Sequence, residues 1–141
     1  MVLFILVLGL AGTATELVLL QHYGDWWQIT PIALIALALL VLLWHGVTRG
    51  TASLRAIQAV MVLFLFSGLI GIGLHYSANA EFEAEMDPSL AGLRLLRESM
   101  SGATPALAPG TMVQLGLLGL VYTYRHPRLN AATPMESRRQ E

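Results

Sequence analysis

Glu16 is a carboxylate well inside a long apolar segment, and it is the most informative candidate for chemistry in this sequence. A carboxylate within a membrane span is costly and normally faces a bundle interior, a water-filled cavity or a partner. At a helical rise of about 1.5 Å per residue, Glu16, Ser67 and Gln114 fall about 9–12 Å from the same membrane side. We therefore expect one polar layer, either a proton or cation site or a protonated Glu16 hydrogen-bonded to its neighbours.

Two histidines, His22 and His75, lie at the ends of the first and third apolar segments on that same side, close to acidic loops. Imidazoles together with carboxylates are the ligands that zinc, copper or iron would need. The sequence has no H-x-x-H, H-E-x-x-H or E-x-x-H motif, so it implies no cofactor, and a metal site would depend on tertiary packing. The alternative is that both histidines are interfacial anchors among lipid headgroups.

Acidic residues alternate with other residues from Glu81 to Asp87, which in extended form would place carboxylates along one edge. Together with the first inter-segment loop they define a candidate outer vestibule of Asp25, Glu81, Glu83 and Glu85. This vestibule is either a rim that attracts cations toward Glu16 or an ordinary solvated acidic loop.

The composition of the chain is too apolar for a water-soluble domain of this size. Its 141 residues are 55% hydrophobic and 12% charged, with a net charge of -1 and a mean hydropathy of +0.63. It has no Cys and no Lys, which excludes disulfides, thiolate metal sites and Schiff-base chemistry. With no recognisable base and nucleophile pair the balance is against an enzyme, and nucleic acid is not an expected partner.

Four apolar segments are long enough to cross a hydrocarbon core about 30 Å thick. They cover residues 1–23, 29–47, 56–76 and 106–124. Glycine-rich stretches in the third and fourth segments provide smooth faces for close helix packing. The sequence therefore predicts an all-α integral membrane protein whose four transmembrane helices form a small bundle within residues 1–126.

The long connection after the third segment predicts one short amphipathic helix over residues 88–101. Asp87 is its expected N-cap, Pro88 its first residue and Gly102 its stop. Its apolar side chains fall on one face, which suits a helix that lies on the outer membrane surface or caps the bundle. The apolar face consists of Leu90, Leu93, Leu96 and Met100.

The arginines predict the orientation in a bacterial inner membrane. Six of the eight lie in the loop after the second segment or in the C-terminal tail: Arg49, Arg55, Arg125, Arg128, Arg138 and Arg139. The positive-inside rule then places both termini in the cytoplasm and the acidic loops outside. Residues 127–141 are expected to form a flexible cytoplasmic tail.

Two functions are consistent with this pattern. The first is a non-enzymatic accessory or interaction subunit, embedded in the lipid bilayer, whose ordered outer loop contacts another membrane protein or a second copy. The alternative is a small permease or binding protein for a cation, proton or metal. It would use Glu16 as the internal site and the outer histidines and acidic residues as its vestibule.

Overall fold

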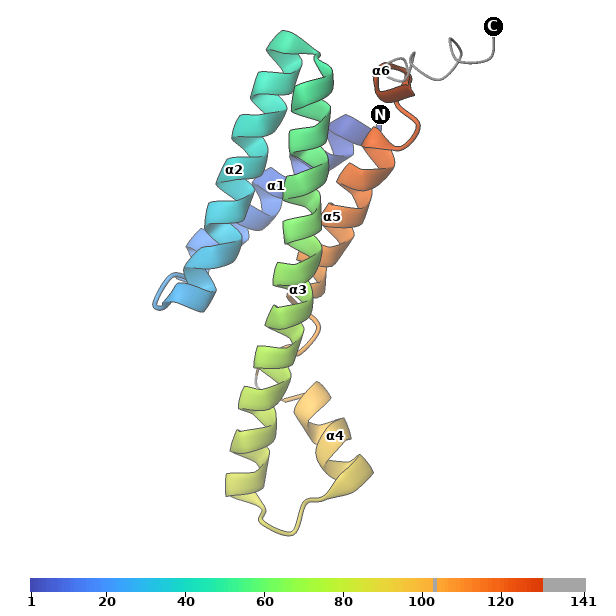
Figure 1. Ribbon diagram of the computed structural model, residues 1–141. Coiled ribbons are helices and arrows are strands. Elements are labelled where there is room, and N and C mark those ends of the chain that lie inside the picture. The colour runs from blue at the N-terminus through green and yellow to red at the C-terminus, as the bar shows by residue number, and fades with distance from the viewer. Residues whose placement is uncertain (103, 131–141) are drawn as a thin grey trace, which may run out of the picture.

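A computed structural model describes residues 1–102 and 104–130, and all the regular secondary structure in this part of the chain is α-helix. Its helices are α1 (Val2–Leu19), α2 (Trp26–Thr48), α3 (Thr51–Met86), α4 (Gly92–Met100), α5 (Gly110–Thr123) and α6 (Pro127–Asn130) (Figure 1). Three of them, α1, α2 and α3, are long and apolar enough to cross a membrane. Most of the predicted cytoplasmic tail, residues 131–141, lies outside the described residues.

The helices α2 and α3 form an antiparallel hairpin, side by side in Figure 1. The side chain of Asp25 caps the start of α2 by accepting a hydrogen bond from the Gln28 N–H at 2.9 Å. This cap starts the helix three residues before the predicted position, so Pro31 lies in its second turn rather than its first. At the other end, Arg49 adopts the left-handed conformation with φ 49°, and the chain reverses into α3.

Helix α3 is far longer than the predicted third span. Its 36 residues correspond to about 54 Å, well beyond the hydrocarbon thickness of about 30 Å. The acidic residues from Glu81 to Glu85 are not in the extended form that would place them along one edge, because helix-forming residues carry α3 through them to Met86. The helix ends where Pro88 forces the preceding Asp87 into an extended conformation.

Helix α4 begins later than predicted, because Asp87 caps a turn instead of a helix. The Ser89 N–H and hydroxyl both donate to Asp87 Oδ1, at 2.9 and 2.6 Å. These two hydrogen bonds, the side-chain one foremost, hold the pKa of the Asp87 carboxyl below its usual value. The helical segment between α3 and α5 is therefore residues 92–100, and Pro88 and Leu90 lie before it.

Helix α5 is also shorter than the predicted fourth span. Its 14 residues correspond to about 21 Å. Pro105 and Pro109 lack an N–H, and the residues between them form tighter turns. In these turns the Ala108 N–H donates to the Pro105 carbonyl at 3.0 Å and the Gly110 N–H to the Leu107 carbonyl at 2.8 Å.

Close packing of α5 against α3 forms the centre of the molecule. A Cβ atom on Gly68 of α3 would lie 2.9 Å from the Pro109 carbonyl oxygen, and one on Gly116 of α5 would lie 2.8 Å from that of Met61. The expected packing at glycine-rich faces is thus confirmed at these positions, whereas Gly73 has open space around it.

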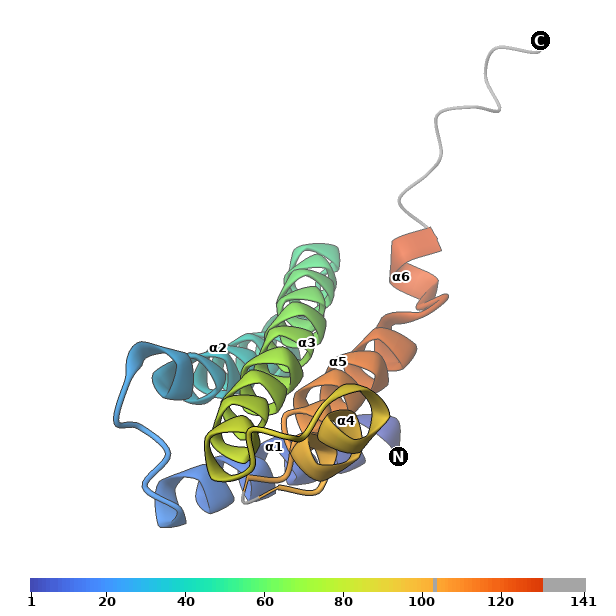
Figure 2. The same ribbon diagram turned by 90° about the horizontal axis from the view of Figure 1, so that it is seen from below.

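Helix α1 crosses obliquely behind the other helices in Figure 1, lies along one side of them in Figure 2, and contacts both α5 and α2. The apolar core draws on α1, α2, α3 and α5. It consists of Leu6, Leu10, Ile35, Ala38, Leu42, Ile57, Val60, Met61, Phe64, Met112 and Leu115.

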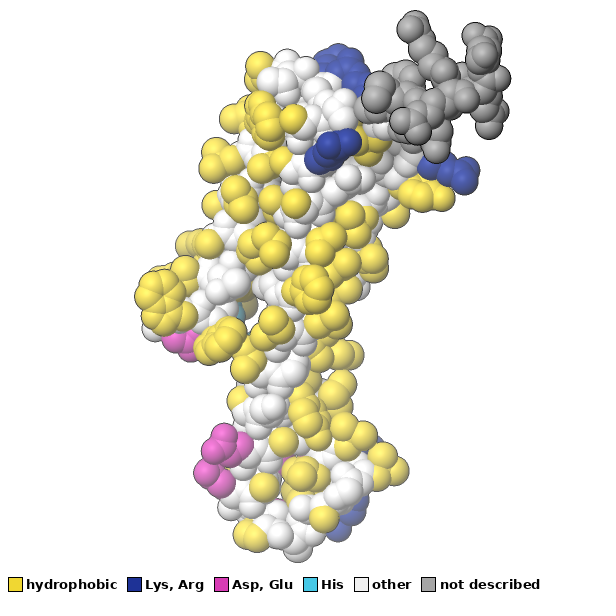
Figure 3. All heavy atoms as spheres, viewed as in Figure 1, with side chains coloured by type: hydrophobic (Ala, Val, Ile, Leu, Met, Phe, Trp, Pro, Cys, Tyr) yellow, Lys and Arg dark blue, Asp and Glu magenta, His cyan; other side chains and the backbone are white. Residues whose placement is uncertain are grey.

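Large apolar side chains cover the outer surface of the bundle (Figure 3). Phe4 and Leu8 on α1 are 70% and 61% exposed, and Leu40 on α2 is 65% exposed. A water-soluble protein does not leave so large a contiguous apolar surface uncovered, whereas lipid chains cover it without cost. The protein is therefore built to contact lipid.

Replacing Gly68 with Ala tests the packing of α3 against α5. The added methyl group meets α5 backbone atoms, which cannot rotate away, so we expect Gly68→Ala to lower the free energy of unfolding by about 1–3 kcal/mol. The matched control is Gly73→Ala in the same helix, where the added methyl group meets open space, so the higher helix propensity of Ala should raise the free energy of unfolding by about 0.5–1 kcal/mol. Unfolding followed by circular dichroism in mixed micelles measures both, and equal stabilities of the two variants would contradict this packing.

Candidate functional site

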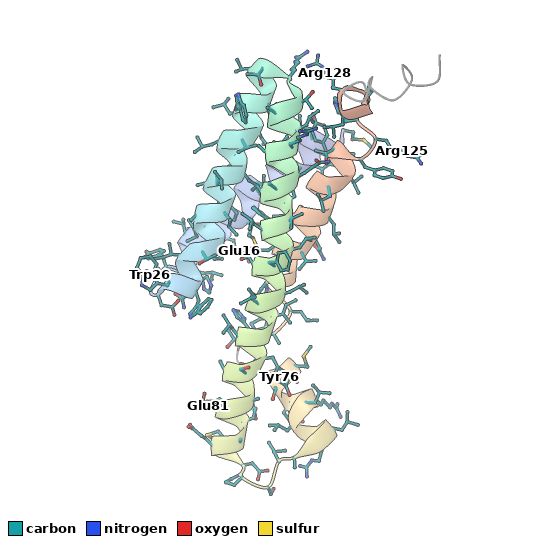
Figure 4. The ribbon with its side chains drawn as sticks, viewed as in Figure 1. Glu16, Trp26, Tyr76, Glu81, Arg125 and Arg128 are labelled. Atoms are coloured by element: carbon teal, nitrogen blue, oxygen red, sulfur yellow. The ribbon has the colours of Figure 1, made fainter. Side chains whose placement is uncertain are left out.

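The residues of the predicted intramembrane layer do not meet. Glu16 and Gln114 are exposed and Ser67 is half-buried, and no hydrogen bond joins any two of these three side chains. Helix α1 buries Leu6 and Leu10, and Glu16 lies about 120° around the helix from Leu10. It therefore lies away from the buried face of α1, near the end of the helix remote from the N-terminus (Figure 4).

His22 and His75 do come together, with ring centroids 6.3 Å apart. The Nδ1 of His75 lies 3.2 Å from the Pro105 carbonyl oxygen, which can only accept, so Nδ1 carries the proton. In the neutral ring Nε2 then keeps its lone pair, as a metal ligand would require. Among the described residues, however, no three His, Asp or Glu side chains gather closely enough to hold a metal ion, so neither Asp25 nor the acidic residues of α3 complete this pair.

A buried polar network that sequence analysis did not single out lies at the opposite end of the bundle. His45 of α2 is only 5% exposed, and its Nδ1 and Nε2 lie 2.8 Å from Ser53 Oγ and 3.1 Å from the Tyr122 hydroxyl. The Ser53 hydroxyl donates to the Gly50 carbonyl at 2.9 Å, so it accepts from His45 Nδ1–H. Tyr122 must then donate to Nε2, and the network links α2, α3 and α5.

Arginines surround this network at the surface. His126 approaches it, with its ring centroid 6.3 Å from that of His45 and 6.2 Å from that of Tyr122. The described arginines at this end, all exposed, are Arg49, Arg55, Arg125 and Arg128. Because both ring nitrogens of His45 already have protein partners, the network fits a structural joint better than a ligand site.

A second buried polar side chain, Asn79, joins the far end of α3 to the chain around α4. Its Nδ2 donates to the carbonyls of Ser99 at 2.9 Å and Thr104 at 2.6 Å. Its Oδ1 accepts from the Thr104 hydroxyl at 3.0 Å and N–H at 3.3 Å. Gly102 lies so close that a Cβ there would be 2.9 Å from Asn79 Cγ. The Asn79 side chain is thus fully satisfied, and it fixes the position of α4.

Residues 77–86 of α3 and helix α4 together form a projecting module, which extends beyond the other helices (Figure 1). Its surface combines large exposed apolar side chains with separated charges. Leu93 is 79% exposed, Met86 70% and Phe82 50%. Acidic side chains line one edge, on α3, and arginines line the other, beside α4 (Figure 3). Glu81, labelled in Figure 4, marks the acidic edge.

No family model, curated protein or solved structure matches this chain. Its own residues are therefore the guide to its function. They offer an imidazole pair with one free ring nitrogen, a buried His45 joint, and a projecting module with an amphipathic surface. Of these, the projecting module is the one that combines large exposed apolar side chains with charged edges.

Removing the Tyr122 hydroxyl tests the His45 joint. Tyr122→Phe leaves His45 Nε2 buried without a donor, so we expect it to lower the free energy of unfolding by about 1–3 kcal/mol. The control Tyr124→Phe removes the same group from a ring that is 69% exposed, and it should have no measurable effect. Thermal unfolding in detergent measures both variants. A Tyr122→Phe protein as stable as the wild type would show that the hydrogen bond contributes nothing.

Proposed function

We propose that this chain is a non-enzymatic accessory or interaction subunit of a bacterial inner membrane, and that the projecting module is its contact surface. The observation that carries the proposal is the set of hydrogen bonds by which the Asn79 side chain fixes the position of α4. A loop that merely joined two membrane helices would need no buried, fully hydrogen-bonded asparagine. It would also need no glycine packed as closely against that asparagine as Gly102 is. Residues 77–86 raise α4 by about 15 Å along the axis of α3, where its apolar side chains meet water unless a protein covers them.

The proposed topology has four crossings, with both termini in the cytoplasm. The turns before α5 add about 2 Å per residue, which extends its 21 Å to about 29 Å, close to the hydrocarbon thickness. The N-terminus, the α2–α3 turn and α6 share one end of the molecule, where Arg125 and Arg128 also lie (Figure 4). Trp26 and Glu81 lie toward the other end, which becomes the outer side when the positive-inside rule places the arginine-rich end in the cytoplasm.

Single introduced cysteines test this topology, because the natural chain has none. In intact cells, a membrane-impermeant maleimide should label Ser89→Cys, whereas Gly50→Cys and Arg128→Cys should react only after the inner membrane is permeabilised. Labelling of Arg128→Cys in intact cells would instead place the segment before it outside the membrane core, leaving three crossings.

A cation or proton permease, the alternative function, has one supporting contact, the His22–His75 pair. Its internal site has less support, because Glu16 faces away from the buried side of α1 and forms no hydrogen bond with Ser67 or Gln114. A transport pathway needs polar side chains that face one another across an interior. We therefore place the interaction function ahead of it.

Loosening the projecting module tests the interaction function. In native-lipid nanodiscs, we expect the wild-type chain to occur in particles heavier than a monomer. Asn79→Ala leaves the Ser99 and Thr104 carbonyls without their donor, and it should shift most of the protein to the monomer while membrane insertion is unchanged. The control Ser77→Ala changes an exposed residue of the same segment and should behave like the wild type. Mass photometry measures the distribution, and a wild-type chain that is monomeric and free of other proteins would refute the proposal.

A further inference from the structure

We propose that the partner of the projecting module is the projecting module of a second copy of this chain. This inference rests on the proposed interaction function and names its partner. It follows from how charged and apolar side chains are distributed over the two helices of the module.

The two charged edges of the module are complementary to each other. Glu81 and Glu85 are four residues apart on α3, so they share one face, and both are exposed. Arg94 and Arg97 are three residues apart on α4, share one face and are also exposed. Glu98, four residues after Arg94, is exposed and borders the same face, so this edge carries two arginines and one glutamate. The two sets lie at opposite edges (Figure 3), and within the described residues neither arginine forms an ion pair with either of these glutamates.

An apolar stripe on α4 lies beside the basic edge. Leu93, Leu96 and Met100 are spaced three and four residues apart, which places them on one side of the helix. They are 79%, 44% and 37% exposed. Ser99, which is fully buried, marks the side of α4 that faces α3, so the stripe is not the surface that holds the module together.

Two-fold symmetry would bring the charged edges and the apolar stripes of two copies together. Two copies inserted in one membrane with the same orientation are related by a two-fold axis along the membrane normal. Rotation about that axis turns one module to face the other and exchanges its left and right edges. The glutamate edge of each copy then meets the arginine edge of the other, and the two apolar stripes pack between them. A face with acid at one edge and base at the other is therefore self-complementary for this axis.

The membrane surface is a poorer occupant of the stripe. Asn79 holds α4 alongside an extension of α3 that continues the direction of a spanning helix, so α4 is not laid flat on the bilayer. Anionic headgroups would attract the arginines beside the stripe, but they would repel the acidic edge, so a bilayer satisfies only one of the two edges. A second copy satisfies both charged edges at once.

Charge reversal gives the first test. We expect Glu81→Arg with Glu85→Arg to raise the dimer dissociation constant in nanodisc-forming lipid at least about tenfold, and Arg94→Glu with Arg97→Glu to do the same. Mixing the two doubly substituted chains, each with its own tag, should restore association as a mixed dimer, because every edge again meets its opposite. The restored mixed dimer shows that both variants are folded.

Disulfide crosslinking gives the second test, again using the absence of natural cysteines. Leu96→Cys lies near the two-fold axis and should form a disulfide with its own copy in oxidised membranes. The control Leu40→Cys is similarly apolar and 65% exposed, but it faces lipid, and its crosslinked fraction should be at least about tenfold lower.

The outcomes separate this inference from the function on which it depends. A mixed dimer together with a Leu96→Cys crosslink supports self-association. Failure of both, with the chain found in a complex with a different protein, overturns this inference and leaves the interaction function standing. Failure of both with a monomeric chain overturns both. A spin label at Leu96→Cys that is quenched by a lipid-soluble reagent and does not crosslink would show that the stripe binds the bilayer instead.

Discussion

The close approach of α3 and α5 is the constraint on which the rest of the structure depends. At Gly68 and Gly116 the two backbones lie too close for any side chain between them, which fixes the register of α5 against α3. That register sets three polar contacts at different heights: Tyr122 against His45, the Pro105 carbonyl against His75, and Thr104 against Asn79. The contacts of His75 and Asn79 both join α3 to the segment between α4 and α5, whose described residues form no helix of their own.

The sequence could predict the parts of the fold that depend on local composition. Three long apolar helices and the glycine contacts follow from hydropathy and residue size, which act over one or two turns. The continuation of α3 beyond the predicted span could not be read from the sequence, because Glu alternating with Ala, Phe and Met suits a helix as well as a strand. Only the Ser89 contacts show that Asp87 caps a turn between the two helices.

The polar contacts could not be predicted, for a different reason. Asn79 bonds to residues 20 and 25 positions away, and His45 to one 77 positions away, so no local pattern marks either pair. For Glu16, the helical rise gives the depth of the side chain along the membrane normal. It does not give the direction in which the side chain points around the axis of α1. That direction depends on which face α1 buries, and that is decided by the side chains of α2 and α5 that pack against it.

The exposed apolar side chains of the bundle and of the projecting module have different physical meanings. Leu40 and Leu93 are exposed to a similar degree, 65% and 79%, but only the first belongs to a helix of spanning length with apolar neighbours on every turn. Lipid covers such a side chain at no cost, and its exposure therefore calls for no partner. Leu93 instead lies at the start of a short helix that carries Arg94 and Arg97, beyond the acidic end of α3, in a segment too polar for the hydrocarbon core. Water would surround it there, so the hydrophobic effect favours protein contact at the module and not along the bundle. Two chains joined at their modules would keep the lipid-facing surfaces of both bundles free, so self-association and contact with another membrane protein are compatible in one assembly.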